Sequence, residues 1–109
     1  MTKINIYRKG KDIVKYTVSG HTEFANAGED IVCAAISALA MNALNGLTDV
    51  VGLLVGYEVR DGYLECILPE NLSEEERKSA NVLLDSLVLS FENLKKQYGK
   101  YITIRKLEV

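Results

Sequence analysis

The sequence predicts an α+β fold in which a small sheet of about five strands is covered by two helices, in the order β-β-α-β-β-α-β. Two observations support this fold class. Two pairs of β-prone segments, each pair joined by a turn, are each followed by a long helix-like segment, and another β-prone segment ends the chain. With 109 residues, 48% of them hydrophobic, the chain can form one core, so residues 1–109 are expected to be a single domain.

The first hairpin is predicted from alternation and from a turn. Ile4 and Ile6 alternate with polar residues, and Gly10 and Lys11 follow as a turn. Residues 13–19 (IVKYTVS) are rich in β-branched and aromatic side chains, which favour the returning strand.

The first helix is predicted over residues 31–45, which follow a loop at 20–29. This segment is rich in alanine and apolar on nearly all sides, and its length favours a buried helix over a strand. Gly46 is predicted to be the left-handed residue that ends this helix.

A second hairpin is predicted between the two helices. Residues 50–60 have a β-like composition, with a bulge or close backbone approach at Gly52 and Gly56. The Asp61-Gly62 pair is a strong hairpin turn, and residues 63–68 form the returning strand.

The second helix carries its own start signal. Ser73 and Glu76 have the spacing of a capping box, in which each side chain bonds the backbone N–H of the other residue. Gly99 ends the helix, and residues 101–109 form the last strand. The core stripe of this helix is predicted to consist of Ala80, Leu84, Leu87, Phe91, Leu94 and Tyr98.

Composition argues against several classes of function. The net charge is −2 and the basic residues do not cluster, so no direct nucleic-acid partner is expected. The most apolar run, at residues 31–44, is interrupted by Ser37 and Asn42 and is expected to be too short to span a membrane. Two cysteines and one histidine cannot supply a four-ligand zinc site. We therefore expect a cytoplasmic protein without a metal or cofactor.

The lone histidine and one cysteine form a candidate catalytic pair. His21 and Cys33 lie on either side of the loop at 20–29. A thiol becomes a good nucleophile when an imidazole or a helix N-terminus favours the thiolate. If Asp30 caps the helix, Cys33 is its third residue, among unpaired N–H groups that could also bind an oxyanion.

Each of these residues also has a structural explanation. Cys33 could be a packing residue, since free cysteine behaves as a small hydrophobe, and His21 could lie on the surface. Asp30 could be a cap alone or could orient the imidazole. Ser37, on the Cys33 face one turn later, could contact substrate or bond a backbone carbonyl. Cys66 alternates with leucines in a strand and is expected to face the core.

The motif that contains the pair resembles the signature of the ribosomal-processing cysteine protease Prp family. The residues are Gly20-His21, Gly28 and DIVCAA-x-S at 30–37, and the resemblance in length and element order extends over essentially the whole chain. One departure is Thr22, where family members often have alanine.

The resemblance implies a bacterial cytosolic endopeptidase that removes the N-terminal extension of a large-subunit ribosomal protein. Cys33 would then be the nucleophile and His21 the general base and acid, with Asp30 in a supporting role. The resemblance also implies a homodimer, and a loop between histidine and cysteine that closes over the peptide. The implied substrates are apolar or aromatic at the cut, with basic residues beside it.

Two expectations about binding follow from the residues themselves. Glu23 lies with other carboxylates near the pair and would attract basic side chains, and Phe24 could cover an aromatic substrate side chain. Val82, Leu83 and Leu89 lie off the core stripe of the second helix, which predicts an apolar patch and a homodimer interface.

Two other functions fit the same residues. A non-catalytic ribosome-assembly module could bind the same peptide, with the DIVCAA helix serving only for packing. A thiol acyltransferase would use the same pair, would leave the peptide bond intact and would require an acyl donor.

Overall fold

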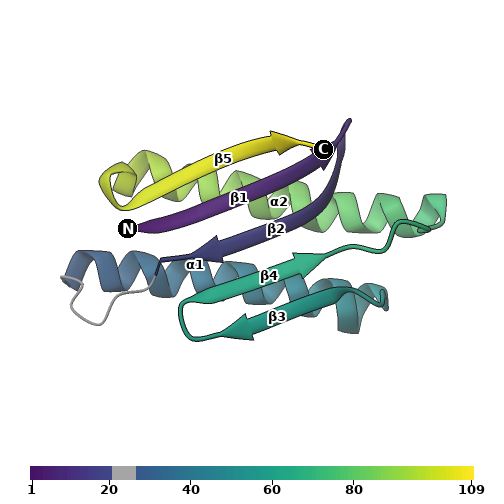
Figure 1. Cartoon of the computed structure of the whole chain (residues 1–109), viewed down its shortest axis with the longest axis horizontal. Helices are drawn as coiled ribbons and strands as arrows, with labels where there is room; N and C mark the ends of the chain where they lie inside the picture. Colours follow the sequence, from purple (N-terminus) through teal and green to yellow (C-terminus); the bar gives the residue numbers. More distant parts are fainter. Residues whose placement is uncertain (21–26) are drawn as a thin grey trace.

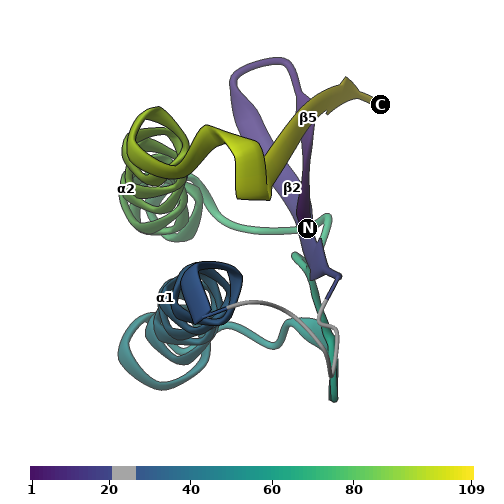
Figure 2. The same ribbon diagram turned by 90° about the vertical axis from the view of Figure 1, so that its left-hand side faces the viewer.

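The computed structural model describes residues 1–20 and 27–109, which form a five-stranded sheet with two helices on one face (Figures 1 and 2). In chain order the elements are β1 (Thr2–Lys9), β2 (Asp12–Ser19), α1 (Ala27–Asn45), the π-helical turn η1 (Gly46–Val51), β3 (Gly56–Arg60), β4 (Tyr63–Ile67), α2 (Glu74–Tyr98), the 3₁₀ turn η2 (Gly99–Tyr101) and β5 (Ile102–Glu108). The predicted fold class is confirmed.

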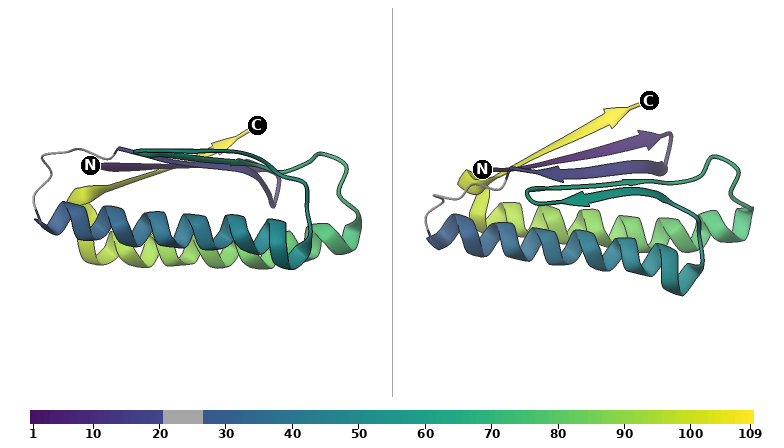
Figure 3. Two further views of the ribbon diagram at one scale, coloured as in Figure 1. Left: turned by 90° about the horizontal axis from the view of Figure 1, so that it is seen from below. Right: turned by 60° about the horizontal axis from the view of Figure 1, so that its bottom comes forward.

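The sheet has the order β3-β4-β2-β1-β5, so the first strand lies inside it and the last strand at one edge. Four strands form antiparallel pairs, whereas β5 runs parallel to β1 with Thr2 opposite Ile102. Both helices run along the sheet on the same side (Figure 3). Alternate residues of β1 and β4, such as Ile4 and Ile6 of β1, are therefore buried against the helices, whereas the residues of β3 are exposed.

The core joins the sheet to both helices. Tyr16 of β2 is fully buried, and its hydroxyl donates a hydrogen bond to the carbonyl oxygen of Ala40 in α1, at 2.9 Å. Cys66 of β4 is 0% exposed, as predicted. This burial raises the pKa of the Cys66 thiol to about 11, because the charged thiolate would be poorly solvated there.

The start of α2 at the Ser73 cap and its end before Gly99 are as predicted, and one residue of the predicted core stripe is not. The Glu76 N–H bonds the Ser73 hydroxyl at 3.1 Å, and the Ser73 N–H bonds the Glu76 carboxylate at 2.9 Å. Ala80, Leu84, Leu87 and Phe91 are buried, together with Val88. Tyr98 is exposed, so its assignment to the core stripe is wrong. The 25 residues of α2 span about 37 Å, whereas an eight-residue strand spans about 26 Å, so the helix extends beyond the sheet.

The predicted start of α1 is wrong, whereas its predicted last residue, Asn45, is confirmed. The helix begins at Ala27, so Asp30 lies within its first turn and is not the N-cap. The prediction that Gly46 is left-handed is wrong, because the chain continues from Gly46 as η1 to Val51, and Gly52, at φ +86°, is the left-handed residue. A Cβ at Gly46 would lie 3.0 Å from Leu83 Cδ1, so this glycine instead permits close packing against α2. The predicted strand at 50–60 consequently starts only at Gly56.

The longer helix also overturns the argument that the apolar run is too short to span a membrane. The 22 residues of Asp30–Val51 are long and apolar enough for a span by length and composition alone. A core helix meets the same criterion. In this fold 33% of an 18-residue apolar window of this segment is buried, and the buried residues of the segment include Val32, Ile36 and Ala40.

Candidate active site

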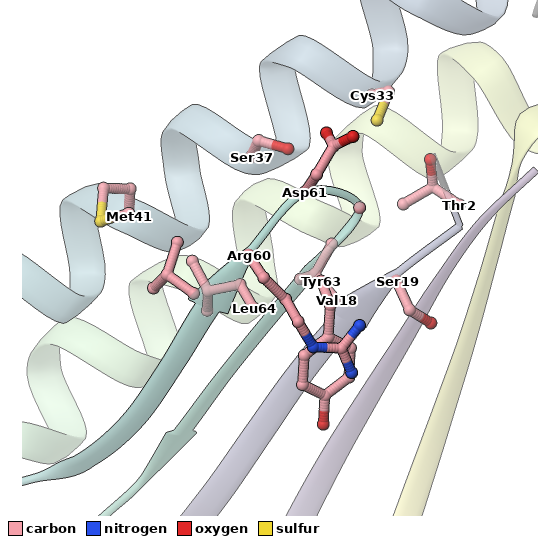
Figure 4. Close-up of a pocket in the computed structure, with 12 residues that line it drawn as sticks. Thr2, Val18, Ser19, Cys33, Ser37, Met41, Arg60, Asp61, Tyr63 and Leu64 are labelled. Carbon is pink, nitrogen blue, oxygen red and sulfur yellow. The ribbon is translucent and has the colours of Figure 1, made fainter. Parts of the chain in front are cut away.

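A cavity of about 260 Å³ lies between α1 and the hairpin of β3 and β4 (Figure 4). One wall is formed by Cys33, Ser37 and Met41 of α1, and the opposite wall by residues 59–64 of the hairpin. Thr2, at the start of β1, and the end of β2 complete the lining. Of the residues proposed from sequence for the site, the structure brings Cys33 and Ser37 together in this cavity.

The three α1 residues share one face because they are four positions apart, and a step of four residues advances about 6 Å along a helix. Cys33 is half-buried and Ser37 exposed. Counted from Ala27, Cys33 is the seventh residue of α1, and the unpaired N–H groups of a helix start belong to its first four residues. The prediction that Cys33 is the third helical residue, among unpaired N–H groups, is therefore wrong.

The charged group nearest Cys33 in the opposite wall is the carboxylate of Asp61, at the hairpin turn. Figure 4 shows this carboxylate directed toward Cys33 and Ser37. Its neighbour Arg60 extends away, with its guanidinium 4.4 Å from the centroid of the Tyr63 ring and Nε 2.9 Å from a Glu58 carboxylate oxygen. Sequence reasoning treated Asp61 only as a turn residue, because its position facing Cys33 depends on how the hairpin packs against α1.

Thr2 adds a polar group to the buried end of the cavity. Its side chain is 1% exposed, and its hydroxyl has no hydrogen-bond partner within the described part of the chain. An unpaired buried hydroxyl is unfavourable by about 1–3 kcal/mol. In Figure 4 this hydroxyl is directed to the side of the cavity where Cys33 lies.

The chain leaves the sheet beside the same cavity. Gly20 follows β2 at φ +111°, and its N–H bonds the carbonyl oxygen of Gly62 in the hairpin turn at 3.3 Å. A Cβ at Gly20 would lie 2.1 Å from the Met1 carbonyl oxygen, so the position accepts only glycine. Gly20, the residue before His21 in the sequence, is therefore held beside the cavity.

The remaining predicted site residues are not all placed. His21, Glu23 and Phe24 lie outside the described residues, as does most of the loop expected to close over a peptide. Asp30 is exposed in the first turn of α1 and does not line the cavity, although a carboxylate there suits the positive end of the helix dipole. Across residues 1–20 and 27–109, no three histidine, cysteine, aspartate or glutamate side chains are grouped to hold a metal ion.

Comparisons with known proteins identify the family. Residues 1–103 match the family described as "Cysteine protease Prp". The ribosomal processing cysteine protease Prp of Bacillus subtilis (strain 168) is 31% identical over 90 residues, which cover 81% of this chain and 80% of that protein.

Solved structures show the same fold. A protein of Streptococcus mutans has a TM-score of 0.87 at 24% identity and covers 100% of this chain and 96% of its own. The protease Prp of S. aureus in complex with a substrate peptide has a TM-score of 0.84 at 17% identity, and the alignment covers 97% of this chain and 99% of that one. The family match extends over nearly the whole chain and includes the cysteine in the cavity wall, and we conclude that the chain belongs to the cysteine protease Prp family.

Proposed function

We propose that the chain removes the N-terminal extension of a bacterial large-subunit ribosomal protein, as an endopeptidase with Cys33 as its nucleophile. The observation that carries the assignment is the contrast between the two cysteines. A protease needs a thiol that a peptide can reach, and Cys33 lines the cavity, whereas Cys66 is 0% exposed and the pKa of its thiol is raised. His21, the single histidine, follows Gly20 beside that cavity and is the proposed general base and acid.

The proposed mechanism is acyl transfer in two stages. His21 accepts the proton of the Cys33 thiol, and the thiolate attacks the carbonyl carbon of the scissile peptide bond. His21 then protonates the leaving amine as the C–N bond breaks, which leaves a thioester on Cys33. Water, deprotonated by His21, attacks the thioester, and the C–S bond breaks to release the new carboxyl terminus and the thiol. No cofactor takes part in these steps.

The choice of substrate is supported by the relatives. The Bacillus subtilis relative is named a ribosomal processing protease, and S. aureus Prp has been crystallised with a substrate peptide and with a covalently linked product peptide. We propose a peptide that is apolar or aromatic at the cut, with basic residues beside it. Asp61 adds a carboxylate to the proposed Glu23, and Ser37 and Phe24 are proposed to contact the peptide.

The proposal includes a cytoplasmic homodimer in which residues 1–109 act as one protease domain. Val82 and Leu89 are exposed on α2, as the predicted patch requires. Leu83 is not part of it, because its side chain packs against the core next to Gly46. Light scattering at micromolar concentration should give the mass of a dimer, and Val82→Glu with Leu89→Glu should give a monomer. A wild-type monomer would contradict the dimer.

The function is tested by incubating the protein with large-subunit ribosomal proteins that carry N-terminal extensions. Mass spectrometry should show one new N-terminus. Cys33→Ala and His21→Ala should each abolish cleavage, and the double variant should be little worse than either, because the two groups act as a unit. Cys66→Ala is the matched control and should keep its rate per folded molecule. Intact substrates throughout, or full activity of Cys33→Ala, would refute the proposal.

A further inference from the structure

Two threonines are buried in the part of the chain that the structure describes, and they differ in their hydrogen bonds. Thr17 is 5% exposed, and its hydroxyl oxygen accepts a hydrogen bond from Asn5 Nδ2 at 3.1 Å. Thr2 is 1% exposed, and its hydroxyl has no partner within residues 1–20 and 27–109. Folded proteins pair almost all buried polar groups, and a catalytic role is one known reason for an unpaired group.

The sheet holds Thr2 at the cavity that contains Cys33. Thr2 pairs with Ile102 of β5, and β1 pairs with β2 on its other side. The backbone of Thr2 also packs against Gly20, where an added Cβ would lie 3.3 Å from Thr2 Cα. Thr2 lines the cavity, and in Figure 4 its hydroxyl is directed to the side where Cys33 lies. The hydroxyl is therefore fixed in place before any ligand enters.

A cysteine protease needs a hydrogen-bond donor in this place. When a thiolate attacks a peptide carbonyl, the electron pair of the C=O bond moves to the oxygen, and donors that bind this oxyanion lower the barrier. The helix-start N–H groups predicted for this role are not beside the thiol, because Cys33 is the seventh residue of α1. Of the polar side chains near Cys33 in Figure 4, the Asp61 carboxylate only accepts hydrogen bonds and Ser37 is exposed to water. The Thr2 hydroxyl is a donor that water does not satisfy.

We propose that the Thr2 hydroxyl is a catalytic group that donates a hydrogen bond to the carbonyl oxygen of the scissile peptide bond. This inference rests on the proposed protease function. The hydrogen bond strengthens as Cys33 Sγ joins the carbonyl carbon and the oxygen gains negative charge, while the hydroxyl keeps its proton. When the C–N bond breaks, the electron pair returns to the C=O bond, and the oxygen of the thioester stays beside Thr2. The same donor then serves the attack by water.

The role of the hydroxyl is tested by removing it without changing the shape of the side chain. Thr2→Val should lower kcat about 100-fold on a peptide that contains the cleavage site, with KM nearly unchanged, because the hydrogen bond matters mainly in the transition state. Thr2→Ser keeps the hydroxyl and should retain most of the rate. Thr17→Val is the matched control, since it removes the other buried threonine hydroxyl outside the cavity, and it should keep the wild-type kcat per folded molecule.

A second measurement separates binding of the oxyanion from binding of the substrate. A peptide aldehyde adds to Cys33 as a hemithioacetal, in which the aldehyde oxygen takes the place of the oxyanion. The inhibition constant of the aldehyde should rise in Thr2→Val by a factor close to the fall in kcat. The dissociation constant of the uncleaved peptide, measured by fluorescence anisotropy with Cys33→Ala protein, should be the same with and without Thr2→Val.

The outcomes separate this inference from the proposed function. A wild-type kcat in Thr2→Val overturns the inference and leaves the function standing, as does an equal loss in Thr2→Ser or in Thr17→Val. An equal change in the dissociation constant of the uncleaved peptide also overturns it, because the hydroxyl would then bind the substrate and not the oxyanion. If Thr2→Val does not fold, Thr2→Ala gives the same comparison. A wild-type protein that cleaves no ribosomal-protein substrate refutes the proposed function and this inference together.

Discussion

Gly20→Ala should be far more damaging than its distance from any reacting atom would indicate. Gly20 has φ +111°, a conformation that costs an alanine about 1–3 kcal/mol. The added Cβ would also lie 2.1 Å from the Met1 carbonyl oxygen, and backbone atoms cannot yield as the end of a side chain can. Relieving the overlap must shift the start of β1, which is held between β2 and β5, at about 1–3 kcal/mol more.

We therefore expect a loss of roughly 2–6 kcal/mol in the free energy of unfolding for Gly20→Ala. Gly10→Ala is the matched control. Gly10 has φ +63°, but a Cβ added there would meet no other atom within 4 Å, so this variant should lose only about 1–2 kcal/mol. Urea unfolding followed by far-UV circular dichroism measures both, which suits a chain without tryptophan. Equal losses in the two variants would refute the argument from close approach.

Further predictions concern the cavity and its surroundings. Limited alkylation and peptide mapping should label Cys33 before Cys66, and label mainly on Cys66 would contradict the assignment. Thr2→Val should raise the melting temperature by about 4–8 °C, since it removes an unpaired buried hydroxyl worth about 1 kcal/mol, whereas a decrease would mean that the hydroxyl is paired in solution. Glu23→Lys should raise KM for a peptide with basic residues beside the cut more than for a neutral peptide. Equal effects on KM would show that Glu23 does not recognise the charge of the substrate. Because burial raises the pKa of the Cys66 thiol from 9.0 to about 11, its contribution to stability is complete below pH 9 and is lost as the pH rises through 11. Cys66→Ala should therefore show a shallower loss of stability than wild type over this range, and an unchanged slope would contradict the link.

The sequence predicted correctly those turns and caps that depend on residues close together in the chain. The capping box at Ser73 and the turn at Asp61-Gly62 involve residues close in sequence, and both formed as expected. The left-handed glycine after α1 was predicted wrongly, because Gly46 and Gly52 are both plausible at that position in sequence. Tertiary packing decided between them, since Gly46 is needed for the approach to Leu83.

The residues of the candidate site also fall into some that the sequence predicted and some that it could not. The motif indicated Cys33 and Ser37, whose spacing of four puts them on one helix face and in one cavity. Thr2 and Asp61 could not be found this way, because one lies at the start of the first strand and the other at a distant turn. They meet Cys33 only through the order of strands in the sheet, which no local pattern encodes.

The parallel pairing of β1 with β5 has a consequence for biosynthesis. Thr2 lies opposite Ile102 and Arg8 opposite Glu108, so the first strand finds its second neighbour only when the last residues have been made. At about 5–20 residues per second, translation of the chain takes roughly 5–20 s, during which this side of β1 stays open. Because Thr2 also lines the cavity, the strand that carries this part of the lining is held on both sides only after β5 has paired with it.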